Sequence, residues 1–171
     1  MKSSSDWVIF GSGQSLEVED VQYVRESGAN VIAVSNSYQL APWAHALVSH
    51  DRKWWESYPE ALHFRGRKFC RQAVRGTEQF TPSVPNGCNS GLMAMEIARD
   101  LFQAKRVILL GFDMHGTHFF GPHGDGLVNT TPVRFNHHIR QFNSWHGPEV
   151  INCTLNSALK KFDFVDLRGI L

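Results

Sequence analysis

The first residues along the chain that could bind a ligand form a glycine turn, Gly11-Ser12-Gly13-Gln14-Ser15, directly after the apolar run 7–10. Glycines after a strand let backbone N–H groups approach a phosphate closely, and a following helix adds its positive end. We therefore expect a nucleotide or another phosphate-bearing ligand to be held by Gly11, Ser12, Gly13 and Ser15. The turn lacks the third glycine of the dinucleotide fingerprint and the Lys of a P-loop. The alternative is a tight strand–helix turn in which Ser15 caps the helix.

Polar residues also follow three further expected strands. Asn36 lies in Ser35-Asn36-Ser37-Tyr38 after the run 31–34, His50-Asp51 follows 46–49, and Asp113 follows 106–110. Ligands of open α/β sheets bind outside the carboxyl ends of the strands. Asn36 could read a base or ribose through its paired donor and acceptor, or it could cap a helix. Because four strand ends are polar, a shared site is favoured over four separate caps.

A third segment, residues 86–91, brings small and polar residues to the start of an expected helix. Asn89 and Ser90 are helix-capping types, and the helix N-terminus offers a second anion cradle. Cys88 is either a nucleophile with a pKa lowered by the helix or, as we favour, an inert buried thiol. The three cysteines form no CxxC pair, which argues against a Cys-based zinc site and favours a reducing compartment.

The richest cluster of imidazoles lies in residues 113–125, which contain His115, His118 and His123 beside Asp113 and Asp125. These types could bind a divalent metal such as zinc, although no HExxH motif is present. The alternative, which we favour, is a glycine-rich lid whose histidines contact the substrate, with no metal ligand assigned. His137 and His138 begin the next expected helix. A neutral imidazole suits the removal of a proton from a sugar hydroxyl, so both are candidate catalytic bases.

The elements that must position these residues alternate between strand and helix along the chain. The expected strands are 7–10, 31–34, 46–49, 61–64, 68–70, 106–110 and 149–152, and the expected helices are 17–25, 89–102, 135–145 and 155–160. This order predicts one α/β domain over 1–171, with a Rossmann-like, doubly wound, mostly parallel sheet. The long His- and Gly-rich loop over 112–134 is expected near the carboxyl ends of the strands, and loops of this length are usually functional.

The composition limits the kinds of partner that we expect for this protein. The 17 Lys and Arg nearly balance the 16 Asp and Glu, so there is no electrostatic reason to expect a nucleic acid or a membrane surface. No apolar run approaches the roughly 20 residues of a membrane helix, and the first six residues do not resemble a signal peptide. We therefore expect a cytoplasmic protein without a membrane span that binds small molecules, and a homo-oligomer is compatible with the sequence.

Several segments together resemble the small single-domain bacterial sialyltransferases that use CMP-sialic acid, and a wider set of bacterial and phage proteins that share their core. The similar segments are 8–16, 35–38, 89–95 and 106–113, while 152–159 looks like the phage-type members. The resemblance implies a nucleotide-sugar-dependent glycosyltransferase whose ligands are a CMP-type nucleotide-sugar and an acceptor.

The resemblance also implies roles for individual residues. The glycine turn and Asn36 would hold the nucleotide, Ser90 would contact the sugar or phosphate, and Asp113 would lie at the base of the site. Tyrosines that hold the leaving phosphate in that family are replaced here by His115 and His118. The family's catalytic histidine corresponds in position to His137 or His138. Two alternatives stay open: a metal-dependent enzyme that transfers phosphoryl or diphosphate groups with the His-rich loop, and a non-catalytic nucleotide-binding module of phage origin.

Overall fold

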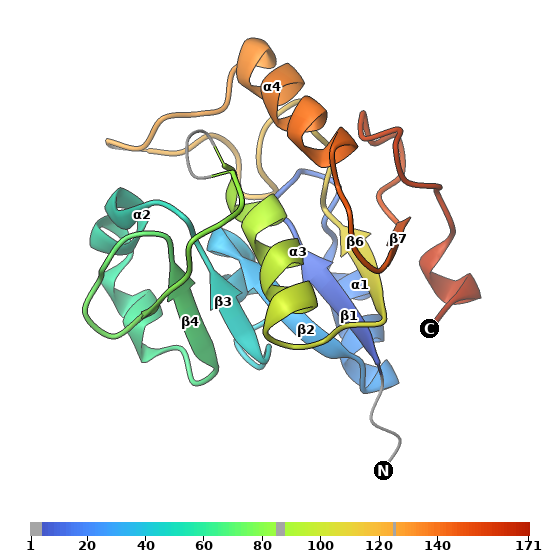
Figure 1. Cartoon of the computed structure of the whole chain (residues 1–171), viewed down its shortest axis with the longest axis horizontal. Helices are drawn as coiled ribbons and strands as arrows, with labels where there is room; N and C mark the ends of the chain where they lie inside the picture. Colours follow the sequence, from blue (N-terminus) through green and yellow to red (C-terminus); the bar gives the residue numbers. More distant parts are fainter. Residues whose placement is uncertain (1–4, 85–87, 125) are drawn as a thin grey trace.

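The computed structural model describes residues 5–84, 88–124 and 126–171 and shows an α/β fold (Figure 1). Within these ranges seven parallel strands form one sheet in the order β5-β4-β3-β2-β1-β6-β7. The strands are β1 (Asp6–Phe10), β2 (Asn30–Val34), β3 (Ala46–Val48), β4 (Arg67–Cys70), β5 (Glu78–Gln79), β6 (Arg106–Leu110) and β7 (Glu149–Asn152). The arrangement is consistent with the Rossmann-like fold predicted from the sequence.

The strand order reverses beside β1. From β1 the chain builds outward through β2, β3, β4 and β5 on one side, and β6 and β7 then extend the sheet on the other. The register pairs Phe10 with Ala33 of β2 and with Leu110 of β6, so the three strands end close together. In open α/β sheets such a reversal leaves a crevice at the carboxyl ends of the strands, which is where ligands bind.

Helices cover both faces of the sheet because alternate residues of its strands point to opposite sides. Trp7 and Ile9 of β1 join the core beneath α3 (Ser90–Asp100) and α4 (Pro132–Asn143). Val8 and Phe10 join the second core, which contains residues of α1 (Val18–Ser27) and α2 (Arg52–Ser57). Figure 1 shows α3 and α1 on opposite sides of the sheet. The described residues also form three short 3₁₀ helices: η1 (Ser35–Gln39), η2 (Pro59–His63) and η3 (Leu167–Gly169).

Two predicted elements are wrong. The expected strand 61–64 belongs largely to η2, which Pro59 begins at the first helical position, where its fixed φ favours a helical turn. The expected helix 155–160 is a series of turns. Asn156 adopts a left-handed φ of 59° there, and Ser157 donates its hydroxyl hydrogen bond to Phe112, far along the chain. Contacts of the loop after β6 therefore override the local helical pattern.

In the described part of the chain, no helix has the combination of length and apolar character that crossing a membrane requires.

Candidate functional site

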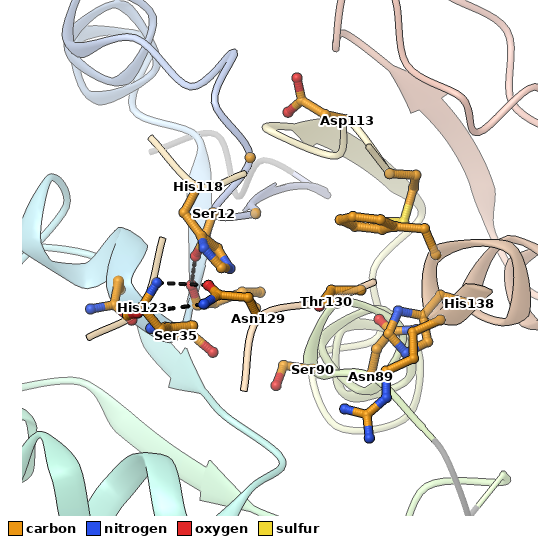
Figure 2. Close-up of a pocket in the computed structure, with 18 of the residues that line it drawn as sticks. Ser12, Ser35, Asn89, Ser90, Asp113, His118, His123, Asn129, Thr130 and His138 are labelled. Atoms are coloured by element: carbon orange, nitrogen blue, oxygen red, sulfur yellow. Dashed lines mark hydrogen bonds between the residues drawn. The ribbon is translucent and has the colours of Figure 1, made fainter. Parts of the chain in front are cut away.

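A cleft of about 640 Å³ opens at the carboxyl edge of the sheet, beside the reversal between β1 and β6 (Figure 2). This volume is typical of a site for a small molecule. The turns after β1, β2, β3 and β6, the N-terminus of α3 and the N-terminal half of α4 all contribute to its walls. Of the residues predicted from the sequence, those that line it are Gly11, Ser12, Gly13, Asn36, Asn89, Ser90, Asp113, His115, His118, His137 and His138.

The glycines of the first turn serve the close approach of two chain segments. Gly11 N–H donates to Leu110 at 2.7 Å, and Gly13 N–H donates to Gly111 at 2.9 Å. A Cβ added at Gly11 would lie 2.4 Å from the Gly111 carbonyl oxygen, and one at Gly13 would lie 1.8 Å from Asp113 Oδ2. The N–H groups of Gly11 and Gly13 are therefore occupied by carbonyl oxygens of Leu110 and Gly111 and are not free to hold a phosphate.

Ser15 has a different role from the one expected. Helix α1 begins at Val18, its N-cap is Glu17, and no side chain caps it. Ser15 instead donates its hydroxyl hydrogen bond to Asp113 Oδ2 at 2.8 Å, and it does not line the cleft. Asp113 is 3 % exposed, and its carboxylate lies against Gly13. The prediction that Ser15 contacts the ligand is therefore corrected: Ser15 and Asp113 tie the two turns together.

The C-terminal part of the chain holds the turn after β6 in place. Phe112 N–H donates to Thr154 Oγ1 at 3.0 Å, and the Phe112 carbonyl accepts from Ser157 Oγ at 2.6 Å. Ala158 N–H donates to the Asp113 carbonyl at 2.9 Å. The backbone of this wall is thus fixed by three hydrogen bonds from a segment more than 40 residues later.

The N-terminus of α3 brings two polar residues to the cleft. Asn89 caps the helix, since its side-chain oxygen accepts from Leu92 N–H at 2.9 Å, so that oxygen is not free for a ligand. Ser90 Oγ accepts from His50 N–H at 3.0 Å and also lies 2.9 Å from His50 Nδ1. His50 lines the cleft, and burial lowers its pKa. The sequence placed His50 among the polar strand ends of the expected site but assigned no chemical role to it.

Asn36 reaches the cleft with only part of its amide free. It is 2 % exposed, and its oxygen accepts from Trp54 Nε1 at 2.8 Å. The paired donor and acceptor expected for reading a base is therefore reduced to the nitrogen side. Trp54 lines the cleft as well, and it fixes the orientation of the Asn36 amide.

Two adjacent histidines of α4 face the same cleft. His137 Nε2 lies 3.2 Å from the side-chain nitrogen of Gln141, one helical turn later. The pKa of His138 is lowered to about 4, first by burial and then by the nearby His137, His50 and Arg134. His138 is therefore a neutral imidazole at neutral pH in the empty cleft.

His118 and His123 form a compact pair on the β1 side of the cleft (Figure 2). Gly13 and His118 form an antiparallel bridge, and the His118 ring stacks on Phe120 at 4.8 Å between centroids. The two imidazole centroids lie 4.4 Å apart, and burial lowers the pKa of each ring. Both Nδ1 atoms are buried and have no hydrogen-bond partner among the described residues. Such a pair is suited to bind a polar group of a ligand.

The metal cluster considered from the sequence is not assembled by the residues that the structure describes. Among them, no group of three or more His, Cys, Asp or Glu side chains has the arrangement of a metal site. Asp125, one of the acids considered, lies outside the described residues, as do Asn86 and Gly87. His115 points its Nε2 toward the Asn156 carbonyl oxygen at 3.0 Å.

Among the described residues, two carboxylates and two permanent cations line the cleft. Both carboxylates accept hydrogen bonds: Asp51 caps α2 by accepting from Lys53 N–H at 2.9 Å, and Asp113 accepts from Ser15. The two permanent cations are Lys53 and Arg134, and the side chain of neither forms a salt bridge with any described residue. An anion that enters the cleft would therefore meet cations whose charge is not already paired.

Comparisons with protein-family models, with curated proteins and with solved structures gave no match to this chain.

Proposed function

We propose that this chain is a nucleotide-sugar-dependent glycosyltransferase that uses a CMP-type mononucleotide donor. The observation that carries the proposal is the convergence of Ser90, Arg134, Lys53 and the α4 histidines on one cleft at the strand-order reversal. A phosphate needs hydrogen-bond donors and positive charge, and a helix N-terminus with nearby cations supplies both. The resemblance to CMP-dependent sialyltransferases supports the choice of donor.

The proposed reaction is a direct displacement at the anomeric carbon of the donor sugar. The acceptor oxygen forms the new bond to that carbon as the bond from the carbon to the phosphate oxygen breaks. The acceptor proton passes to a histidine, and the bonding electrons leave with the nucleotide phosphate. Arg134, Lys53 and the Ser90 hydroxyl stabilise the charge that develops on the phosphate.

Of the two α4 histidines, His138 suits the base best. It is kept neutral in the empty cleft, so its ring can accept a proton. A bound phosphate brings negative charge close to the ring and raises its pKa toward neutrality, because an opposite charge favours the protonated form. The base thus gains strength when the donor is present, which limits its action to the loaded enzyme.

Thermal unfolding with nucleotides tests the proposal. We expect CMP at millimolar concentration to raise Tm, UDP, GDP and ADP to raise it less, and cytidine, which lacks the phosphate, to have little effect. Arg134→Gln should remove most of the CMP shift. Arg65→Gln is the matched control, because Arg65 precedes β4 at the opposite edge of the sheet. No stabilisation by any nucleotide would contradict the proposal.

A second function, metal-dependent transfer of a phosphoryl or diphosphate group, is favoured by the unpartnered Nδ1 atoms of His118 and His123. Neutral imidazole nitrogens are good ligands for zinc and similar ions. Zinc titration of untagged protein, followed by calorimetry, would test it. Stoichiometric binding that His118→Ala abolishes and His63→Ala preserves would support this function, whereas a stability indifferent to zinc and chelators would remove it.

A further inference from the structure

We propose that Ser90 and His50 form a nucleophile–base pair that hydrolyses small carboxylic esters in the cleft. The two side chains come from separate elements, the turn after β3 and the first residue of α3. Ser90 Oγ lies 2.9 Å from His50 Nδ1, which is hydrogen-bond distance, and both residues line the cleft. This activity does not depend on the glycosyl transfer proposed above.

The hydrogen bonds around Ser90 direct its hydroxyl hydrogen. Ser90 Oγ already accepts from His50 N–H at 3.0 Å. In the tautomer that carries its proton on Nε2, His50 Nδ1 accepts the Ser90 hydrogen. A nucleophile and base within about 2.6–3.2 Å of each other is the arrangement that activates serine for attack. The backbone N–H of His50 fixes the oxygen while the ring of the same residue takes the proton.

The surroundings keep the base neutral and can stabilise an oxyanion. Burial lowers the pKa of His50, so the ring is unprotonated at neutral pH. Ser90 begins an 11-residue helix, and no described residue accepts a hydrogen bond from the N–H of Ser90 or Gly91. First-turn N–H groups beside the nucleophile are suited to stabilise the oxyanion of a tetrahedral intermediate.

The reaction has two steps that balance in atoms and protons. Ser90 Oγ attacks the ester carbonyl carbon, its proton passes to His50 Nδ1, and the same proton protonates the alkoxide as the ester C–O bond breaks. Water then attacks the acyl-serine and gives its proton to His50. The Ser90 oxygen recovers that proton as the acid leaves, so the net reaction consumes one ester and one water.

The substrate class follows from the walls of the cleft. A volume of about 640 Å³ limits the substrate to a small molecule. Phe135 supplies apolar surface that can contact an acyl group, and Arg134 supplies a cation for an anionic alcohol portion. We therefore expect short-chain esters of anionic or polyhydroxylated alcohols to be preferred over long-chain lipids.

Covalent labelling of the full chain tests the pair. A fluorophosphonate probe should add one phosphonyl group, and peptide mapping by mass spectrometry should place it on Ser90. Hydrolysis of p-nitrophenyl acetate should fall by about 100-fold or more in both Ser90→Ala and His50→Ala. Ser144→Ala and His146→Ala, which change the same residue types outside the cleft, should leave the rate unchanged.

A thiol variant keeps the test decisive if the alanine variants fail to fold. Ser90→Cys keeps a small side chain at the first helical position, and iodoacetamide should label it faster at pH 7 than it labels the native cysteines. Those thiols are all buried, and burial raises the pKa of Cys88 and Cys153 to about 12 and raises that of Cys70. Failure of the probe to label Ser90, an adduct on another residue, or hydrolysis that both alanine variants retain would overturn the proposal.

Discussion

Helices α1 and α3 both begin at the carboxyl edge of the sheet, yet only α3 brings its first residue into the cleft. In the glycine turn before α1, the Gly11 and Gly13 N–H groups donate to backbone carbonyl oxygens at the end of β6 and just after it. Helix α1 has no side-chain cap. Helix α3 is capped by Asn89, and Ser90 contacts His50. The glycine-rich turn therefore connects two chain segments here, and the chemistry that we propose belongs to the less conspicuous helix start.

The largest expected effect tests the structural side of this difference. Gly13→Ala should cost about 3 kcal/mol or more of unfolding free energy, because its Cβ would overlap Asp113 and the Gly111 carbonyl. Gly169→Ala, where a Cβ meets nothing within 4 Å, is the control and should change stability by about 0.5 kcal/mol or less. Urea denaturation measures both. A Gly13→Ala cost close to that of the control would mean that the two turns are not in contact.

Serine substitutions separate the two helix starts next. Ser15→Ala should cost about 2 kcal/mol, because it removes a donor from the buried Asp113 carboxylate. Ser90→Ala should cost less stability but reduce the Tm shift produced by CMP. Denaturation and thermal shift on the same preparations give both quantities. The opposite pattern, with ligand binding lost in Ser15→Ala alone, would return the ligand to the glycine turn.

A pH series examines the α4 side of the cleft. The pKa of His138 is about 4 in the folded chain, below the ordinary value of 6.5, so the unfolded chain binds more protons between these values. His138 therefore destabilises the fold as pH falls from 6.5 toward 4. His138→Asn should unfold at a higher urea concentration than the native chain at pH 5, relative to their order at pH 7.5. The exposed His146, changed to Asn, should show no such gain, and an equal gain in both variants would count against a half-buried His138.

The smallest expected effect concerns the caps. Asn89→Ala should cost about 1 kcal/mol, since it removes the side-chain acceptor for Leu92 N–H. Glu17→Ser should stabilise the chain by about 0.5 kcal/mol, because α1 lacks a side-chain cap at that position. Thermal unfolding of the two variants measures the asymmetry. An equal loss of stability in both variants would show that Glu17 already provides what the N–H groups at the start of α1 require.

The local hydrophobic pattern predicted correctly the strands whose residues are buried along their whole length. The apolar runs at 7–10, 31–34 and 106–110 are the central strands β1, β2 and β6, buried on both faces. The same logic failed at 155–160, where hydrogen bonds to Phe112 and Asp113 decide the conformation. Such contacts join residues some 40 positions apart and leave no periodic trace.

The sequence predicted the position of the cleft better than it predicted the role of each residue in it. Polar strand ends indicated the edge of the sheet at which the cleft opens, and most of the predicted residues line that cleft. The role of Ser15 depends on Asp113, 98 positions later, and that of Ser90 depends on His50, 40 positions earlier. These partnerships follow from the parallel pairing of β1 with β6 and from the packing of α3 beside β3. No short motif records either one.

The three hydrogen bonds between residues 154–158 and the turn after β6 also mean that the cleft wall is completed late during synthesis of the chain. A ribosome delivers the chain from its N-terminus, so β1, β2 and β6 are synthesised before Thr154, Ser157 and Ala158 exist. Until those residues emerge, the wall formed by Phe112 and Asp113 lacks its support. A nascent chain can thus build most of its sheet while its cleft is incomplete, and the wall of the cleft gains its support only after residues 154–158 have been made.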